Sequence, residues 1–372
     1  MSLSIDDLPQ ELIDAISDSS TLVSIAPQKA QEQYLASRRG EIRDQTVEEY
    51  RNKLGVFVEY CGQNGLNDLN EVDGRFLAEY MQYRRTETAP SGESLSNKTL
   101  RDDMYLLQDF VSYLESIEAV PANLSEKVKI PKLSAGDGVR DMNFDPDLLN
   151  SILDHLNKFE YASAAHVIFV YHGHTGRRPG GLYSLDLRDL HLDCEDPYIE
   201  FKHREGETEL KNGSNGEGQV SIHESVAEVF QDYITNNRHD VTDDFERCPF
   251  LTSEFGRLSK SSMRKRVYAF TRPCVVSGEC PHNRDPENCD AAQTLNAASK
   301  CPSSKPPYSL RHGYITAKIK QGVPRKVISG RCDVSEDIIE KHYDESDENE
   351  KRELRQEVLE QIQAENEQEG YL

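Results

Sequence analysis

A stretch that fits neither a helix nor a strand pattern divides this sequence in two. Between Pro121 and Arg140 the chain contains prolines, small residues and glycines but no apolar period. Such a composition is typical of a linker between domains. The chain has 372 residues, which is enough to bury a separate core on each side. We therefore predict two domains joined by a linker at residues 121–142.

The segment before the linker carries the 3.6-residue period of amphipathic helices. Thr46 and Glu49 have the spacing of a capping box, and apolar residues on one helical face follow them. Further helices are predicted from Asp73 and over residues 100–114. Residues 35–120 are thus expected to form an all-helical domain, and residues 1–34, with one short helical pattern at 8–16, a peripheral segment.

The segment after the linker mixes both periods. Helices are predicted at residues 148–156, 162–172, 226–234, 260–270, 310–320 and 325–329, and a short one starts at a capping box of Asp333 and Glu336. Two short alternating runs, PYIEFK and QVSIH, flank a glycine-rich charged stretch, as in a β-hairpin. The predicted fold is mainly α with a small β-sheet, in a second domain at 143–345.

Charge is distributed unevenly along the chain. It has 43 basic and 66 acidic residues, a net charge of −23, which by itself disfavours a polyanionic partner. Residues 257–331 nevertheless contain 15 Lys and Arg against 4 Asp and Glu, whereas residues 333–372 contain 4 against 15. One segment is therefore suited to meet DNA, and a salt-rich cytoplasm accounts for the overall acidity.

The acidic tail at 346–372 has two interpretations. Its Leu354, Val358, Leu359 and Ile362 have helical spacing, which fits a segment that packs on a neighbouring protomer. A solvated end is the alternative. The start of the chain has no secretory signal pattern and no apolar run long enough to span a bilayer, so a soluble, cytoplasmic protein is expected without membrane association.

Four separated pieces of the second domain fit one chemistry, the transfer of a DNA phosphoryl group to a tyrosine. Arg178 lies in HTGRRPGGL, Tyr308 and Arg311 lie in PYSLRHG, Arg331 follows a glycine, and Tyr343 lies in EKHYD. Over about residues 46–343 the sequence resembles the tyrosine recombinase (phage integrase) family, whose boxes read T-G-x-R and H-x-x-R-H with a tyrosine downstream. The cysteine-rich insert, the motif DVSEDIIEKHYD and the acidity resemble the recombinases of salt-loving archaea.

The resemblance implies the fold and the reaction. It implies an all-helical core-binding domain at 35–120, a tyrosine-recombinase catalytic domain, and a dimer or tetramer on double-stranded DNA. Tyr343 would form a 3′-phosphotyrosyl bond, and Arg178 and Arg311 would stabilise the charge on the phosphate oxygens. Lys211 is the candidate general acid, with Lys202 as a rival. Neither a catalytic metal nor ATP is needed, because the phosphotyrosyl bond conserves the energy for religation.

Three positions depart from the family pattern. Tyr308 stands where the second box has His, and it can donate a hydrogen bond but cannot exchange protons near neutral pH. Arg331 stands where His or Trp is common and could add a third phosphate donor. Gly181 replaces a frequent acidic residue. A recombinase-like DNA-binding protein without strand exchange is therefore the alternative function.

A cysteine-rich stretch gives a separate hypothesis. Its potential metal ligands are Cys274, Cys280, His282, Cys289 and Cys301. Four Cys or His side chains can hold a structural zinc ion, although paired C-x-x-C knuckles are missing. The alternatives are free or packed cysteines, or a zinc-dependent nucleic-acid-binding module without cleavage.

Overall fold

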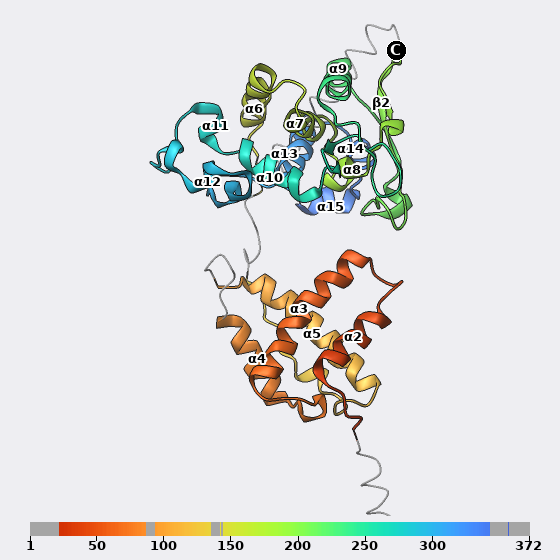
Figure 1. Ribbon diagram of the computed structural model, residues 1–372, viewed down its shortest axis with the longest axis vertical. Coiled ribbons are helices and arrows are strands. Elements are labelled where there is room, and N and C mark those ends of the chain that lie inside the picture. Colours follow the sequence, from red (N-terminus) through yellow and green to blue (C-terminus); the bar gives the residue numbers. More distant parts are fainter. Residues whose placement is uncertain (1–21, 87–93, 135–141, 143, 343–355, 357–372) are drawn as a thin grey trace, which may run out of the picture. The chain divides into compact units, whose positions relative to one another are not determined.

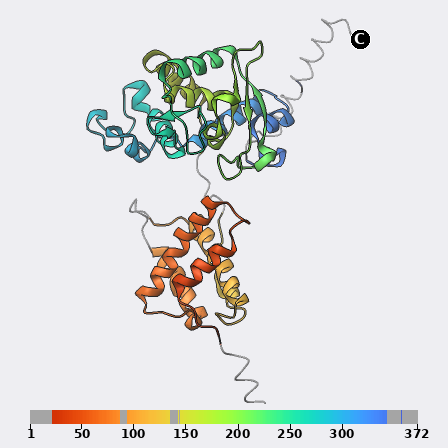
Figure 2. The ribbon, with the colours of Figure 1, turned by 45° about the vertical axis from the view of Figure 1, so that its right-hand side comes forward.

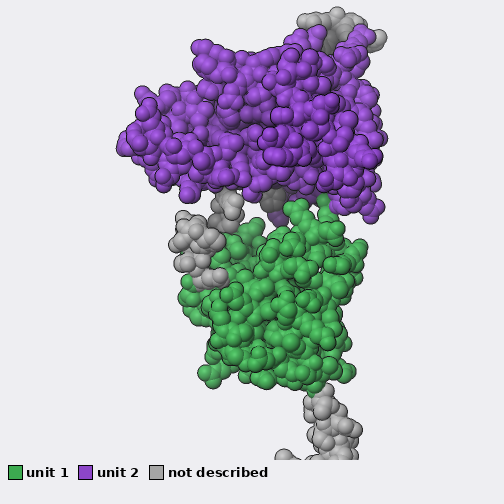
Figure 3. Space-filling model, in the orientation of Figure 1, with its two compact units in different colours: residues 1–140 green, residues 141–372 purple. Residues whose placement is uncertain are grey.

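The computed structural model describes residues 22–86, 94–134, 142, 144–342 and 356. Two compact units, residues 1–140 and residues 141–372, make up the chain (Figure 3). Each unit has its own hydrophobic core. Within the described ranges, no helix combines the length and the apolar character that crossing a bilayer requires.

Unit 1 is all-helical, as the periodicity predicts. Its helices are α2 (Pro27–Ser37), α3 (Asp44–Gln63), α4 (Gly74–Thr86) and α5 (Asn97–Ser116), with 3-10 turns at Leu69–Glu71 and Ser125–Lys127. Aromatic rings join these helices, because Phe57 packs edge-on against Tyr80 at 5.0 Å and Tyr34 against Phe110 at 5.3 Å between ring centroids. The core therefore draws on every one of the four helices.

The core of unit 1 extends beyond the expected boundaries. Tyr34, in the segment predicted to be peripheral, is fully buried, and Leu124 and Val128, in the predicted linker, also belong to this core. Apolar residues are spaced too widely in these two segments to produce a helical period. The capping box at Thr46 is also wrong, because α3 begins at Asp44 with Arg43 at the N-cap.

Unit 2 is mainly helical with two small antiparallel sheets (Figure 1). Its helices are α6 (Pro146–Phe159), α7 (Ala164–Thr175), α8 (Pro179–Ser184), α9 (Glu224–Asp232), α10 (Lys260–Phe270), α11 (Pro273–Ser277), α12 (Asp290–Gln293), α13 (Pro307–Lys320), α14 (Arg325–Cys332) and α15 (Glu336–His342). Its strands are β1 (Leu190–His191), β2 (Tyr198–Phe201), β3 (Gly218–Ser221), β4 (Thr252–Ser253) and β5 (Gly256–Arg257). The predicted pairing is confirmed, since β2 pairs with β3 and places Ile199 opposite Val220.

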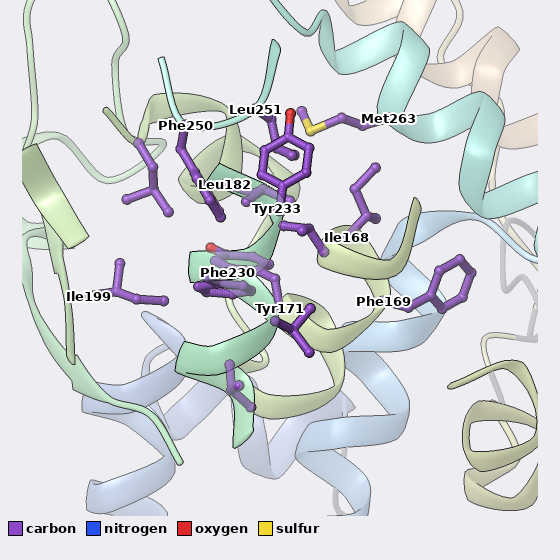
Figure 4. Packing of buried hydrophobic residues seen from close by; sticks show 14 of the residues in the cluster. Ile168, Phe169, Tyr171, Leu182, Ile199, Phe230, Tyr233, Phe250, Leu251 and Met263 are labelled. Atoms are coloured by element: carbon purple, nitrogen blue, oxygen red, sulfur yellow. The ribbon is translucent and has the colours of Figure 1, made fainter. Parts of the chain in front are cut away.

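Helix α7 is the centre of unit 2. Val167, Ile168, Phe169 and Tyr171 are all fully buried, and a helix that is apolar on every side is a core helix. Figure 4 shows Ile168 and Tyr171 beside residues from other elements, among them Phe230 of α9. The end of α7 leads directly into the T-G-x-R segment, so the core fixes where that segment lies.

A buried ionic network joins the chain after α8 to the β4–β5 region. The Asp186 carboxylate accepts from Arg257 and lies 3.7 Å from Arg204, and Asp243 accepts from Arg257 at 2.8 Å and from Arg247 at 2.7 Å. The Asp186 side chain is only 2% exposed. Because charges this deeply buried need partners, the network holds these loops together.

We expect Asp186→Ala to lower the free energy of unfolding of unit 2 by about 2–3 kcal/mol, because the buried Arg257 would lose one of its two carboxylate partners and keep only Asp243. Urea unfolding of the full chain measures this. Asp240→Ala is the matched control, since Asp240 is fully exposed and pairs with Arg238 only at 3.6 Å. Equal stability losses in the two variants would contradict a structural role for the network.

Candidate active site

A glycine turn at the end of α7 projects two consecutive arginines. Gly176 caps the helix in the left-handed region, with φ of 61°, and Pro179 begins α8. A Cβ at Gly176 would lie 2.2 Å from Cδ1 of Tyr314 and 2.9 Å from Sγ of Cys332, so no other residue fits here without movement. Conformation and close packing together require this glycine.

Arg177, to which the sequence assigned no role, holds the site together. It is 3% exposed, and its guanidinium donates to the carbonyls of Arg331 at 2.8 Å, Gly216 at 2.7 Å and Gly330 at 3.3 Å. The same group lies over the ring of Phe201 at 4.3 Å. Arg177 thus ties α7 to α14 and to the chain before β3. The T-G-x-R pattern selects Arg178, and it carries no information on a structural role for the residue before it.

Arg178 is paired with a carboxylate from another part of the chain. Its Nη1 donates to Oδ2 of Asp333 at 2.6 Å and to the carbonyl of Asp333 at 2.7 Å. Asp333 therefore supplies Arg178 with a carboxylate partner, which the family pattern would lead one to expect from an acidic residue at position 181. A Cβ at Gly181 would lie 2.8 Å from the Tyr171 hydroxyl and 3.2 Å from Phe201, so position 181 has no room for an acidic side chain.

Asp333 does not begin a helix, so the predicted capping box is wrong. It follows α14 with φ of 54° and ψ of 62°, in the left-handed conformation. The backbone N–H of Val334 donates to Ser329, and those of Ile338 and Ile339 donate to Ser335. The Asp333 carboxylate is instead used by Arg178 and by Asn212, whose Nδ2 donates at 2.7 Å.

Arg311, in the second turn of α13, contacts the same residue, Asp333. Its residue is 1% exposed, and its guanidinium donates to the carbonyls of Gly176 at 3.0 Å, of Cys332, and of Asp333 at 3.3 Å. Within the described residues its Nε has no hydrogen-bond partner. Arg178 and Arg311 therefore meet at the carbonyl of Asp333, and their role at a phosphate stays a prediction.

Cys332 is buried beside the glycine turn at Gly176. Its Sγ donates to the carbonyl of Thr175 at 3.7 Å, and the thiol is fully buried. Burial raises the pKa of Cys332 to about 11.

Arg331 is held within the protein. Its Nε donates to the hydroxyl of Tyr314 at 2.8 Å, and its Nη2 donates to the carbonyl of His174 at 3.0 Å. These bonds attach α14 to α7 and α13. The predicted role as a third phosphate donor stays a prediction, because this geometry accounts for Arg331 as a structural tie.

The two candidate lysines have different surroundings. Lys211 is exposed, and its neighbour Asn212 donates to Asp333, which brings this stretch of chain to the arginines. Lys202 pairs with Glu200 at 3.1 Å at the end of β2. Each lysine thus has a neighbour that contacts the site, Asn212 for Lys211 and Phe201 for Lys202, and the general acid stays a prediction.

Tyr308 is the one of the two predicted site tyrosines that lies within the described residues. Tyr308 is 44% exposed, three residues before Arg311, so the two side chains share a face of α13. Tyr343 lies outside the described residues. Helix α15 ends at His342, one residue before it.

The cysteine-rich stretch packs on α10, on the side of unit 2 away from the β2–β3 sheet in both views of the ribbon (Figures 1 and 2). Burial raises the pKa of the Cys274 thiol, and the nearby Cys301 and Cys280 also raise it. Nε2 of His282 lies 2.9 Å from the hydroxyl of Ser303. Among the described residues, no three His, Cys, Asp or Glu side chains are arranged as metal ligands, so zinc stays a prediction from spacing alone.

No protein-family model matches the sequence, and no curated protein matches it. The integrase of transposon Tn1549 in complex with a circular intermediate DNA has a TM-score of 0.62 and 15% identity, over 90% of this chain and 100% of that chain. A lambda integrase dimer bound to a COC′ core site has a TM-score of 0.55 and 14% identity, over 93% and 81%.

A third solved structure matches a smaller part. The N-terminal domain of a phage integrase/site-specific recombinase from Haloarcula marismortui is 31% identical, with a TM-score of 0.27, over 29% of this chain and 99% of that chain. The two longer matches show that this chain has the fold of those integrases, with helical domains and a small antiparallel sheet.

We expect the stability of unit 2 to fall as the pH drops from 7 to 5. Burial lowers the pKa of His172, whose Nδ1 lies 3.2 Å from the Arg177 carbonyl, to about 4. An unfolded histidine titrates near pH 6.5, so in this window the unfolded chain binds a proton that the folded chain does not. His172 alone should reduce the free energy of unfolding by about 2 kcal/mol.

Urea unfolding at pH 7, 6 and 5 in fixed salt measures this slope. Burial also lowers the pKa values of His166 and His174 to about 4, so all three histidines act in the same direction. His172→Gln should flatten the slope without removing it. Identical slopes for the parent and the variant would contradict the assignment to His172.

Proposed function

We propose that this chain, a member of the tyrosine recombinase family, is a site-specific DNA recombinase that cleaves and rejoins DNA through a covalent bond to Tyr343. The observation that carries the proposal is the meeting of Arg178 and Arg311 at Asp333, on the chain that leads through α15 to position 343. Two guanidiniums that converge on one oxygen suit an anion with several oxygens, such as a phosphodiester.

The reaction needs no metal and no ATP. The phenol of Tyr343 gives its proton to water as its oxygen attacks the phosphorus, and the bond from phosphorus to the 5′ oxygen breaks. A 3′-phosphotyrosyl bond forms, and Lys211 gives a proton to the leaving oxygen as general acid. Attack by a 5′ hydroxyl on the phosphotyrosine reverses these steps and joins new ends. Bond energy is conserved at each exchange.

The arginines would act on the charge that develops during this transfer. Guanidiniums held in fixed positions stabilise the phosphate oxygens more in the transition state than in the ground state. Arg177 supports this site, because its guanidinium donates to the carbonyl of Arg331 in α14 and to that of Gly216. Tyr308, exposed on the same helix as Arg311, would add a hydrogen-bond donor to the phosphate, and Arg331 is the remaining candidate.

Double-stranded DNA is the proposed partner, and a dimer or tetramer of this chain is the proposed assembly. The Tn1549 and lambda integrases were solved in complexes with DNA, the latter as a dimer. We extend both properties to this chain, since two recombining sites need one nucleophile for each exchanged strand. Unit 1 would be the core-binding domain on DNA.

The alternative is a DNA-binding protein of the same fold that has lost strand exchange. Tyr308 favours it, because the family has a histidine at this position that can exchange protons near neutral pH. The first experiment separates the two functions. A binding site is selected from a random duplex library, built into a nicked suicide duplex, and tested for a covalent protein–DNA adduct on a denaturing gel.

We expect Tyr343→Phe to abolish the adduct while the affinity for the selected duplex stays within about twofold of the parent. The reason is that the missing oxygen is the nucleophile and contributes little to affinity. Affinity is measured by fluorescence anisotropy with the same duplex without the nick.

The control is Tyr105→Phe, which removes a half-exposed hydroxyl in unit 1 and should keep the adduct. An adduct that persists in Tyr343→Phe would remove this residue as the nucleophile. Absence of an adduct from the parent protein, with specific binding intact, would favour the alternative function.

We expect Arg178→Ala and Arg311→Ala each to slow single-turnover cleavage by about a hundredfold or more, as loss of one transition-state donor does in other enzymes. Arg311→Ala also empties a buried position, so its folding is checked by circular dichroism. Arg188→Ala is the matched control, because that arginine is 63% exposed on a neighbouring turn. Unchanged cleavage in a folded variant would remove that arginine from the mechanism.

A further inference from the structure

Asp333 is the acceptor on which the proposed catalytic groups converge. Its carboxylate accepts from Arg178 on one oxygen and from Asn212 on the other, at 2.6 and 2.7 Å. Its carbonyl accepts from Arg178 and Arg311, at 2.7 and 3.3 Å. One residue thus presents three oxygens to the arginines and to the neighbour of Lys211, in the way that a phosphate group would.

The backbone at Asp333 is held in a conformation that favours glycine. Its φ of 54° is left-handed, which is unfavourable for a residue with a Cβ, although Asp and Asn tolerate it better than most. Glycine would avoid this cost at a helix end. The charged hydrogen bonds of the Asp333 side chain offset this conformational cost. The carboxylate therefore has a role besides ending α14.

The same residue restricts access to Arg311. Arg311 is 1% exposed, and the carbonyls of Cys332 and Asp333 occupy its Nη atoms. A phosphate group can reach this guanidinium only after that dipeptide has moved. The side chain of Arg178 is 23% exposed, so an anion from solvent can approach it while the Asp333 carboxylate competes for it.

We propose that Asp333 occupies the phosphate position when DNA is absent, and that the scissile phosphate must displace its carboxylate from Arg178. That the displacing anion is a DNA phosphate rests on the proposed function. Until displacement, Asp333 neutralises Arg178 and holds the Asn212 stretch, with Lys211, against the site. Only Val334 and Ser335 separate Asp333 from α15, so displacement also shifts the start of that helix.

Inorganic phosphate tests this without DNA. Its affinity for the full chain is measured from the rise in melting temperature with phosphate concentration, at constant ionic strength in chloride. Removal of a competing internal anion should strengthen phosphate binding by about fivefold or more, the usual lower range of coupling between two ligands. We expect this for Asp333→Asn, which keeps the size and the left-handed preference, and for Asp333→Gly, which suits the backbone.

Two controls locate the effect. Asp337→Asn removes the same charge from an exposed position on α15 and should bind phosphate like the parent. Adding Arg178→Ala to Asp333→Asn should abolish the gain, because Arg178 is the group that the carboxylate covers. Phosphate affinity equal to or below that of the parent in both Asp333 variants would overturn the inference and leave Asp333 as a fixed support for Arg178.

The outcome is separable from that of the cleavage assay. If both Asp333 variants gain phosphate affinity and the parent forms no covalent adduct, the internal anion stands and the proposed recombinase activity fails. If the adduct forms and phosphate affinity does not rise, the inference fails and the proposed activity stands.

Discussion

The guanidinium of Arg177, buried beneath the site and bonded to main-chain carbonyls, is the constraint on which the rest of unit 2 depends. A buried cation is costly unless every donor is directed at an acceptor. Arg177 meets this requirement with carbonyls from α14 and from the chain before β3, and with the face of Phe201. Segments more than 150 residues apart are therefore fixed at one place, and Arg178 beside it faces outward because Arg177 faces inward.

Local patterns predict most of the fold and less of the site. The longer helices other than α2, and the β2–β3 pairing, follow from residue periods, which are properties of neighbouring residues. The short helices α8, α11 and α12 and the β4–β5 pair have too few residues to show a period. Helix α2 was missed because Tyr34 and its neighbours have too few apolar positions to show a period, although the core of unit 1 buries them. The general position of Arg178 and Arg311 came from motifs, and their convergence is consistent with that reading.

Asp333 illustrates what sequence patterns miss. The spacing of Asp333 and Glu336 indicates a helix cap, yet the side chain bonds to Arg178, 155 positions away. Competition between a local cap and a distant arginine depends on the three-dimensional position of both groups. Gly181 indicates that Arg178 lacks the acidic partner expected at that position, but nothing in the sequence identifies Asp333 as its partner.

The basic segment at 257–331 has fewer arginines available to DNA than its composition indicates. Arg257 is paired with Asp186 and Asp243, Arg272 bonds to the carbonyl of Ala291, and Arg331 bonds to Tyr314 and His174. Only cations that reach phosphates release counterions from DNA. The proposed binding to DNA would thus depend on the remaining surface cations, such as Arg264, and respond to salt less steeply than 15 basic residues would give.

The buried thiol of Cys332 gives the site a particular chemical tolerance. Thiolates react with oxidants and alkylating reagents, whereas thiols do so slowly, and burial raises the pKa of Cys332 to about 11. Cys194 and Cys248 are exposed. Cys274, Cys280 and Cys289 are partly exposed. Maleimide dyes should therefore attach to these five cysteines while the sulfur beside the arginines stays unmodified, so fluorescent labels can be introduced without first replacing Cys332.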